Sequence, residues 1–208
     1  MTPEQLVQAV NKAQAEHNYD ECVKLLSEII AKQPRNTDAF NNRGLAYADL
    51  KQFKKAIQDY NQAIELDPEY TYAFNNRGLA YADLKQFEKA IQDYNQAIKL
   101  NPKNARAFNN RGNTYTKLKQ FEKAIQDYNQ AIELDPEYTY AFNNRGLAYA
   151  DLKQFKKAIQ DYNQAIELNP KDARVFNNRG TAYADLKQFE KAIQDYNQAI
   201  ELNPKDAD

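Results

Sequence analysis

A strict internal repeat runs through this chain and constrains its fold more than any other feature of the sequence. The residue numbers of the five glycines rise by 34 at each step, and those of six of the seven prolines do the same. Cut in phase with this spacing, the 208 residues give six units, at 3–36, 37–70, 71–104, 105–138, 139–172 and 173–206. The last five units are close copies, whereas the first keeps the length and few of the letters. A fixed period of this size is typical of an array of repeats, each a single supersecondary unit.

Each unit is predicted to form two helices joined by a tight turn. In residues 37–70, a first set of anchors is spaced by 4, 3 and 3 residues and therefore shares one helix face: Phe40, Gly44, Tyr47 and Leu50. Residues 53–66 carry an apolar stripe with i, i+3, i+4, i+7 spacing. Only residues 51–52 separate the two stretches, so the helices must run antiparallel. Pro68 closes the unit because proline cannot continue a helix.

Small residues recur at fixed places in the unit, at Gly44, Ala56 and Ala63. They predict a close approach between helices. With the aromatic anchors they make up the pattern Phe40-x2-Arg43-Gly44-x2-Tyr47, Ala56-x3-Tyr60, Pro68. This pattern resembles the tetratricopeptide repeat, and the same residues recur in all five later units. The resemblance implies an all-α fold, a right-handed α–α superhelical solenoid of antiparallel helix pairs, with residues 1–208 as a single domain.

An arginine departs from the family pattern in each of the five later units. The usual residue at this position is leucine, and here it is replaced by Arg43, Arg77, Arg111, Arg145 and Arg179. We expect a half-covered position at which the aliphatic stem packs and the guanidinium reaches water. The sequence names no partner for it.

Composition excludes several classes of function. Lys and Arg total 28 and Asp and Glu total 29, so the net charge is -1, and nothing draws the whole chain to nucleic acid or an anionic membrane. No apolar run approaches the ~18 residues of a membrane span. The start of the chain lacks the features of a signal peptide, and no Asn-x-Ser/Thr acceptor occurs. We therefore expect a cytoplasmic protein with neither a nucleic-acid nor a membrane partner.

Catalysis is not expected, and neither is a metal or a cofactor. The chain has one histidine, His17, in the predicted turn of the first unit, and one cysteine, Cys22, where later units have a small buried alanine. A lone buried thiol acts as a small hydrophobe. The carboxylates of the repeated Asp-Pro-Glu and Gln-Asp-Tyr motifs lack the glycine turn of a calcium loop, and are predicted to lie in turns and on the solvent face.

The resemblance places function in a concave groove formed by the first helix of each unit. Its groove-facing fifth and sixth positions are asparagine in every later unit: Asn41, Asn42, Asn75, Asn76, Asn109, Asn110, Asn143, Asn144, Asn177 and Asn178. Asparagine is a poor helix former, so this repetition needs a reason. One reading is a ladder of amides that pairs with the backbone of an extended peptide. The other is that repeat copying multiplied a tolerated residue whose amides are solvated or pair between neighbouring helices.

Variation between the units is concentrated in this groove. The second position changes from Asp38 to Tyr72, Arg106, Tyr140 and Arg174, and the unit at 105–138 also introduces Asn113 and Lys117. Tyrosines with a polar tip are typical interface anchors, although Tyr70 and Tyr138 are equally expected to pack between repeats. The carboxylate clamp of chaperone-tail binders fits poorly, because Asn109 and Asn178 stand where the clamp has cations.

Two functions follow from these patterns. The first is a protein–protein interaction scaffold that binds an extended peptide or partner segment in the groove. The alternative is a self-assembling array, natural or engineered, that docks through the end of the last repeat. There the apolar stripe of residues 191–202 has no following helix to cover it, so we expect exposed apolar side chains and a homodimer through the C-terminal repeat. A fragment of a longer array would expose the same face.

Overall fold

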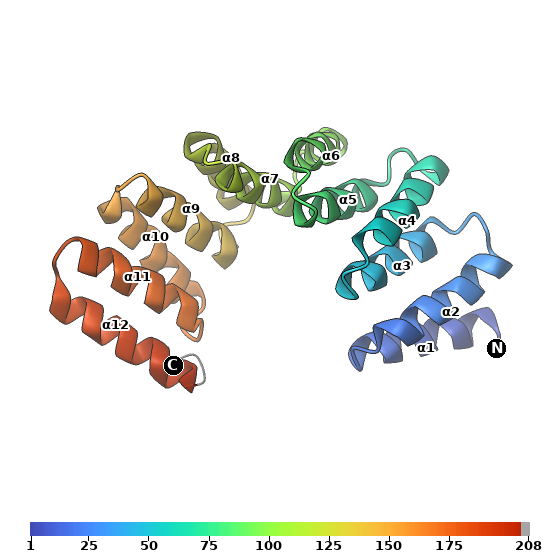
Figure 1. The fold of residues 1–208 in the computed structure, drawn as a ribbon, viewed down its shortest axis with the longest axis horizontal. Coiled ribbons are helices and arrows are strands. Elements are labelled where there is room, and N and C mark those ends of the chain that lie inside the picture. The colour runs from blue at the N-terminus through green and yellow to red at the C-terminus, as the bar shows by residue number, and fades with distance from the viewer. Residues whose placement is uncertain (205–208) are drawn as a thin grey trace. The chain divides into compact units, whose positions relative to one another are not determined.

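The computed structural model describes residues 1–204, and all regular structure within them is helical (Figure 1). The chain divides into two compact units, each of which spans several 34-residue repeats. The first unit is residues 1–102 and the second unit is residues 103–208, and the two are described separately. The first unit contains α1 (Pro3–Ala15), α2 (Tyr19–Lys32), α3 (Thr37–Asp49), α4 (Phe53–Leu66), α5 (Thr71–Asp83) and α6 (Phe87–Leu100). The second contains α7 (Ala105–Lys117), α8 (Phe121–Leu134), α9 (Thr139–Asp151), α10 (Phe155–Leu168), α11 (Ala173–Asp185) and α12 (Phe189–Leu202).

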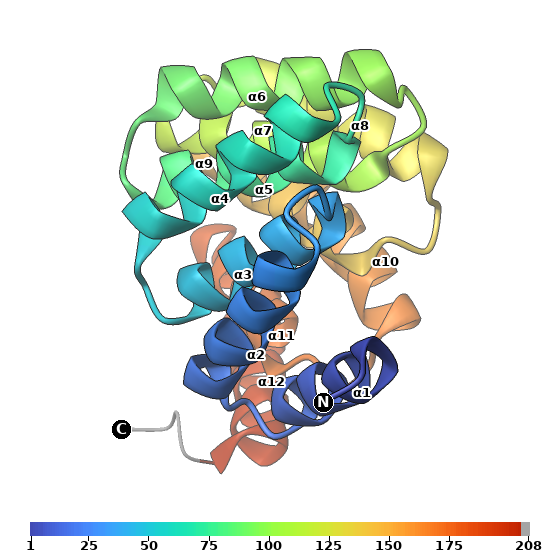
Figure 2. The same ribbon diagram turned by 90° about the vertical axis from the view of Figure 1, so that its right-hand side faces the viewer.

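The predicted helix pairs are confirmed, and each predicted repeat holds one pair. The second helix of a pair runs back along the first, as α3 and α4 do (Figures 1 and 2). Within each compact unit the pairs stack in chain order, so α4 packs on α5 and α8 on α9. The all-α fold class is therefore confirmed for the described residues. The prediction that residues 1–208 form a single domain stays a prediction.

A lysine in the left-handed region of backbone space makes the tight turn between the two helices of a pair. Lys51 has φ 59°, and its N–H donates to the carbonyl oxygen of Ala48 at 2.9 Å. The next N–H, of Gln52, donates to the carbonyl oxygen of Tyr47 at 2.8 Å. These bonds satisfy two carbonyls at the end of α3, in the way that a helix commonly ends on glycine. His17 takes the same conformation after α1, which confirms its predicted place in the turn.

A tyrosine of the second helix explains the glycine in each first helix. A Cβ added to Gly44 would lie 2.5 Å from Cε1 of Tyr60, and the other four glycines meet Tyr94, Tyr128, Tyr162 and Tyr196 in the same way. Tyr60 is 1% exposed. The predicted close approach of the helices is confirmed, and the ring of the second helix fills the space that a side chain on the first would need.

Neighbouring repeats share their core through small residues. In the first unit, Ala80 of α5 packs with Ala56 and Tyr60 of α4. In the second unit, Ala148 of α9 packs with Ala124 and Tyr128 of α8 in the same way. Each repeat thus builds its core against the next one along the chain.

The divergent first repeat has an aliphatic core instead. It contains Leu6, Val10, Leu25 and Leu26, and Cys22 is fully buried within it, as predicted.

Candidate functional site

Each repeated arginine makes a two-pronged ion pair with a buried aspartate of the following helix. The Nε and Nη2 atoms of Arg43 donate to Oδ2 and Oδ1 of Asp59 at 2.8 and 2.7 Å. The other arginines make the same pair of bonds with Asp93, Asp127, Asp161 and Asp195. Asp59 is 5% exposed. Two sequence predictions are therefore wrong: the guanidinium does not project into water, and the aspartate of Gln-Asp-Tyr does not face solvent.

The physical reason is that a buried carboxylate needs a charged partner with matching geometry. A guanidinium supplies two parallel donors and offsets much of the cost of removing the carboxylate from water. Burial still raises the pKa of Asp127 and Asp161, against the lowering effect of Arg111 and Arg145. The guanidinium also lies over an aromatic ring, with Cζ of Arg77 5.5 Å from the centroid of Phe74.

The same arginine makes a third hydrogen bond, to a side chain of the preceding repeat. Nη1 of Arg145 and of Arg179 donates at 2.7 Å to Oδ1 of Asn129 and Asn163 respectively, each on the second helix of the repeat before. Arg77 bonds Asn61 in the same way, and Arg43 bonds Oγ of Ser27 at 3.0 Å. The arginine therefore stabilises the stack of repeats, and this role distinguishes it from the groove-facing residues.

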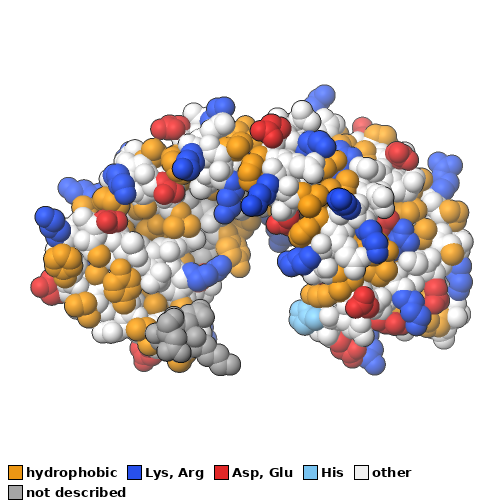
Figure 3. All heavy atoms as spheres, viewed as in Figure 1, with side chains coloured by type: hydrophobic (Ala, Val, Ile, Leu, Met, Phe, Trp, Pro, Cys, Tyr) orange, Lys and Arg blue, Asp and Glu red, His pale blue; other side chains and the backbone are white. Residues whose placement is uncertain are grey.

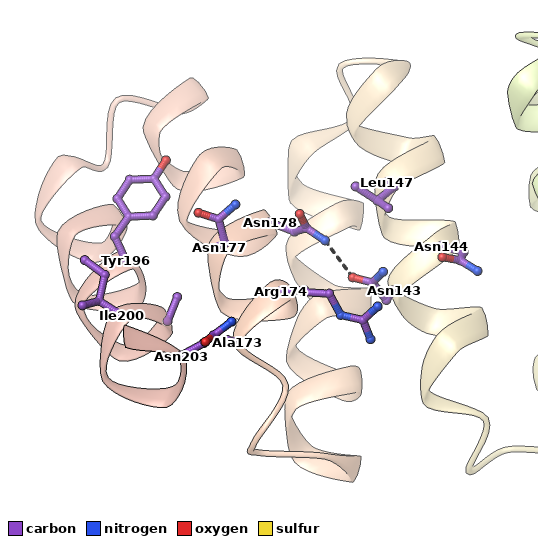
Figure 4. A pocket seen from close by; sticks show the side chains of 11 residues that line it. Asn143, Asn144, Leu147, Ala173, Arg174, Asn177, Asn178, Tyr196, Ile200 and Asn203 are labelled. Carbon is purple, nitrogen blue, oxygen red and sulfur yellow. Dashed lines mark hydrogen bonds between the residues drawn. The ribbon is translucent and has the colours of Figure 1, made fainter. Parts of the chain in front are cut away.

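The predicted asparagines of the groove form pairs between neighbouring first helices. Nδ2 of Asn178 donates to Oδ1 of Asn143 at 2.9 Å (Figure 4). Asn144 donates to Asn109 at 3.0 Å in the same way. Asn76 donates to Asn41 at 2.9 Å in the first unit. Sixth-position amides thus donate to fifth-position amides one repeat earlier. This is the inter-helix pairing that the second reading of these asparagines described.

The burial of these asparagines varies along the chain. Asn41 and Asn109 are 5% and 4% exposed. The half-buried ones are Asn42, Asn75, Asn76, Asn110, Asn143, Asn144 and Asn178. Asn177 is exposed and is therefore the most accessible of the ten amides.

The residues at the variable positions are mostly exposed. Tyr72 and Tyr140 are 67% and 55% exposed, and Arg106, Lys117 and Arg174 are also exposed. Asn113 differs from them, because its Oδ1 accepts a hydrogen bond at 2.8 Å from the hydroxyl of Tyr128. That oxygen therefore bonds a side chain of its own repeat, on the second helix of the pair.

A hollow of about 680 Å³ in the second unit brings five of the predicted residues together (Figure 4). They are Asn143 and Asn144 of α9 and Arg174, Asn177 and Asn178 of α11. Asn203 and apolar side chains from three helices complete the lining, the apolar ones being Leu147, Ala173, Tyr196, Ala199 and Ile200. These apolar residues were not predicted as part of the site, although the second-helix stripe of residues 191–202 contains three of them, Tyr196, Ala199 and Ile200.

Arg174 is the charged group in the lining of this hollow and is held from two sides. Its Nε and Nη2 donate to Oδ1 and Oδ2 of Asp172 at 3.0 and 2.8 Å, and its Cζ lies 5.8 Å from the ring centroid of Tyr140. The hydrogen bonds from Arg174 lower the pKa of Asp172, which also caps the N-terminus of α11. The guanidinium therefore has a fixed place at the edge of the hollow.

A smaller hollow of about 270 Å³ lies in the first unit, between α1, α2 and α3. Val7, Val10, Asp38 and Asn42 belong to its lining. Asp38 occupies the second position of its repeat, as Arg174 does in the larger hollow. The two hollows thus share amides and apolar residues and differ in the sign of the charge.

The side chains of residues 1–204 give no indication of a metal centre. Among them, His, Cys, Asp and Glu form no group of three that could hold a metal ion. No helix in that part of the chain is long and apolar enough to cross a membrane.

Stacked antiparallel helix pairs with hollows lined by amides define a helical-repeat scaffold for protein interaction. A family model described as tetratricopeptide repeat matches residues 37–70, 105–138, 139–172 and 173–206. Two related models, described as TPR repeat and tetratricopeptide repeat, match residues 80–119 and 59–92. The chain belongs to the tetratricopeptide repeat family.

Solved structures show the same fold. A crystal structure of MamA is 25% identical, with a TM-score of 0.70 over 79% of this chain and 96% of that one. YrrB, described as a TPR protein with an unusual peptide-binding site, is 23% identical, with a TM-score of 0.65 over 86% and 93% of the two chains. PilF of Pseudomonas aeruginosa is 18% identical, with a TM-score of 0.82 over 97% and 92%.

Proposed function

We propose that the first-helix face of the second unit binds an extended segment of a partner protein. The observation that carries this proposal is the 680 Å³ hollow, in which amides, an apolar wall and one guanidinium converge. Binding pockets for ligands combine apolar lining with a few placed polar groups in this way. The description of YrrB as a TPR protein with a peptide-binding site supports the same use of the fold.

The paired amides keep hydrogen-bonding capacity after they pair. An asparagine side chain has two N–H donors and a carbonyl oxygen with two lone pairs, and the bond from Asn178 to Asn143 occupies one donor and one lone pair. The remaining groups can pair with the backbone of an extended segment whatever its side chains are. Fixing the amides against one another also reduces the entropy lost on binding.

The apolar wall supplies the second part of the recognition. Leu147 is 38% exposed and Ile200 is 48% exposed, and both line the hollow. An apolar side chain of the bound segment would cover them and remove their surface from water, at about 25 cal/mol per Å². We therefore expect an extended segment with at least one apolar residue.

Peptide selection tests this function and needs no named partner. A random peptide-display library is selected on the intact chain, and affinities of the enriched peptides are measured for three variants. Asn177→Ala and Leu147→Ala change the hollow, and Lys156→Ala changes an exposed lysine on α10 outside its lining. We expect the first two to weaken binding about 5- to 10-fold, because each removes about 1 kcal/mol of contact, and the third to leave it unchanged. Equal affinity for all three variants, or no enriched peptide, would contradict the proposal.

Self-association is a second candidate function, favoured by the exposed face of α12. Phe189, Ile193 and Ile200 are 57%, 58% and 48% exposed. Figure 3 shows hydrophobic side chains gathered over α11 and α12. The residues at the same positions of the preceding repeat, Phe155, Ile159 and Ile166, are half-buried against the core that α11 completes.

Two copies that meet through α12 would cover this apolar surface and close as a dimer. Light scattering over a concentration series, on the wild type and on Ile193→Lys, tests this candidate. We expect a dimer that the substitution dissociates. A wild type that stays monomeric at high concentration would contradict it.

The proposed partner is a protein, and the proposed location is the cytoplasm. A net charge of -1 gives the chain no general attraction for nucleic acid or an anionic membrane. The sequence has no Asn-x-Ser/Thr glycosylation acceptor, which favours the cytoplasm.

A further inference from the structure

Two tyrosines and an aspartate form a cluster on the first unit. The hydroxyl of Tyr70 donates to Oδ1 of Asp38 at 2.5 Å. The ring of Tyr70 stands at 62° to that of Tyr72, with the centroids 5.7 Å apart. Tyr72 is 67% exposed, and Asp38 is exposed as well. Tyr70 therefore contacts both an exposed carboxylate and an exposed aromatic ring.

Tyr70 occupies a position at which its side chain gives up a stabilising hydrogen bond to the helix. It occupies the N-cap of α5, where α3, α7 and α11 have Asn36, Asn104 and Asp172, whose side chains accept a helix N–H. Tyr70 makes no such bond, and losing a cap costs about 1 kcal/mol. Its hydroxyl instead fixes the carboxylate of Asp38.

In the second unit, a cation lies over one ring of an equivalent tyrosine pair. Tyr138 and Tyr140 form the same perpendicular pair, at 73° and 6.1 Å. There the guanidinium of Arg174 lies over the ring of Tyr140, with Cζ 5.8 Å from the centroid, and bonds a carboxylate, that of Asp172. The chain itself thus supplies a cation between a tyrosine face and a carboxylate.

The two tyrosine pairs differ in the charge placed beside them. Asp38 stands in the first unit where the matching repeat of the second unit has Arg106. Asp38 also lines the 270 Å³ hollow, and the other described residues of that lining have apolar or amide side chains. The first unit therefore presents a carboxylate in the lining of a hollow, joined through Tyr70 to an exposed aromatic ring.

We infer that Asp38, Tyr70 and Tyr72 bind a lysine or arginine side chain of the partner segment. The cation pairs with the carboxylate of Asp38, and its face or stem lies on the ring of Tyr72. Tyr70 is a positioning residue, because it holds the carboxylate in place. This inference extends the proposed function to the first unit and rests on it.

The experiment compares peptides selected from one display library on four proteins: the wild type, Asp38→Asn, Asp38→Arg and Tyr72→Leu. The substituted residues are exposed, and circular dichroism checks that helix content is unchanged. Lys156→Ala, at an exposed position on α10 outside the lining of the hollow, is the control. We expect peptides selected on the wild type to be enriched in lysine and arginine, and Asp38→Arg to remove the enrichment.

Binding of one enriched peptide then gives the size of the effect. We expect Asp38→Asn to weaken it at least 10-fold and Tyr72→Leu 2- to 5-fold, with Lys156→Ala close to the wild type. Replacing the key arginine of the peptide by citrulline, which keeps the shape and removes the charge, should cost the wild type as much as Asp38→Asn does. Peptides without basic enrichment, or an affinity that Asp38→Asn leaves unchanged, would overturn this inference and leave groove binding intact. Failure to select any peptide would overturn both.

Discussion

Arg77 and Asp93 lie side by side in two parallel hydrogen bonds, from Nε to Oδ2 at 2.8 Å and from Nη2 to Oδ1 at 2.7 Å. Asp93 is 6% exposed, so its carboxylate has given up most of its contact with water. The arginine replaces the leucine usual in the family, and its third bond, to Asn61, reaches the second helix of the preceding repeat. A position that is normally apolar thus carries an ionic link between three helices.

Arg77→Leu restores the usual family residue and should nevertheless destabilise the protein. The substitution leaves the carboxylate of Asp93 buried without its cation, which costs about 3–5 kcal/mol of unfolding free energy. Urea unfolding followed by circular dichroism measures the loss. The double variant Arg77→Leu/Asp93→Asn removes the charge as well and should regain most of it. A single variant within about 1 kcal/mol of the wild type would show that the pair contributes little.

Gly44→Ala and Gly180→Ala should differ, although both glycines face a tyrosine. The added Cβ would lie 2.5 Å from the ring of Tyr60 in one case and 2.8 Å from that of Tyr196 in the other. Tyr60 is 1% exposed and has no room to move, whereas Tyr196 is half-buried and can shift. We expect Gly44→Ala to cost about 1–3 kcal/mol through overpacking. Gly180→Ala should be close to neutral, because alanine's helix propensity offsets a smaller strain. Equal losses in thermal unfolding would contradict this explanation.

Lys51→Gly should stabilise the protein. Lys51 has φ 59°, in a region that glycine enters without the steric cost borne by other residues. We expect a gain of about 1 kcal/mol in unfolding free energy. Gln58→Gly, at an exposed position inside α4, is the matched control and should lose about as much. If both substitutions destabilise the protein, the turn does not favour glycine.

The contribution of Asp172 to stability should depend on pH in a defined direction. The hydrogen bonds from Arg174 lower the pKa of this carboxyl in the folded protein below its ordinary value of 3.8. Its stabilising effect is therefore present above the ordinary value and is lost as the pH falls through the lowered one. We expect Asp172→Ala to cost about 1 kcal/mol at pH 7, through the lost cap and ion pair, and the difference from the wild type to shrink towards pH 2. A difference that stays constant over this range would contradict the assignment.

The repeats, the helix pairs and the close approach of the helices could be predicted because each follows from spacing and periodicity along the sequence. The constant spacing of the glycines and prolines defines the repeat, and helix periodicity places Gly44 on the inner face. The arginine–aspartate pairs were missed for a different reason. Asp59 follows a charged and amide-rich stretch that looks solvent-facing, and its partner lies 16 residues away on another helix. The shared period of Arg43, Asp59 and Asn61 was the available signal.

The candidate site was predicted in its residue types and less well in its geometry. The sequence placed asparagines on one face, but not the bond between Asn144 and Asn109, because that bond depends on the offset between two stacked helices. Ile200 was missed because it belongs to a second helix, whereas the family resemblance places the groove on the first helices.

Photo-crosslinking of a selected peptide tests the central claim, binding on the first-helix face, most directly. The apolar residue of an enriched peptide is replaced by benzoylphenylalanine, and the crosslinked residues are identified by mass spectrometry after digestion. The account predicts crosslinks to Leu147 and to its neighbours in the hollow, such as Asn177 and Ile200, with loss of the signal when unmodified peptide competes. Crosslinks confined to exposed positions outside the hollow, such as Lys156 of α10, would contradict it.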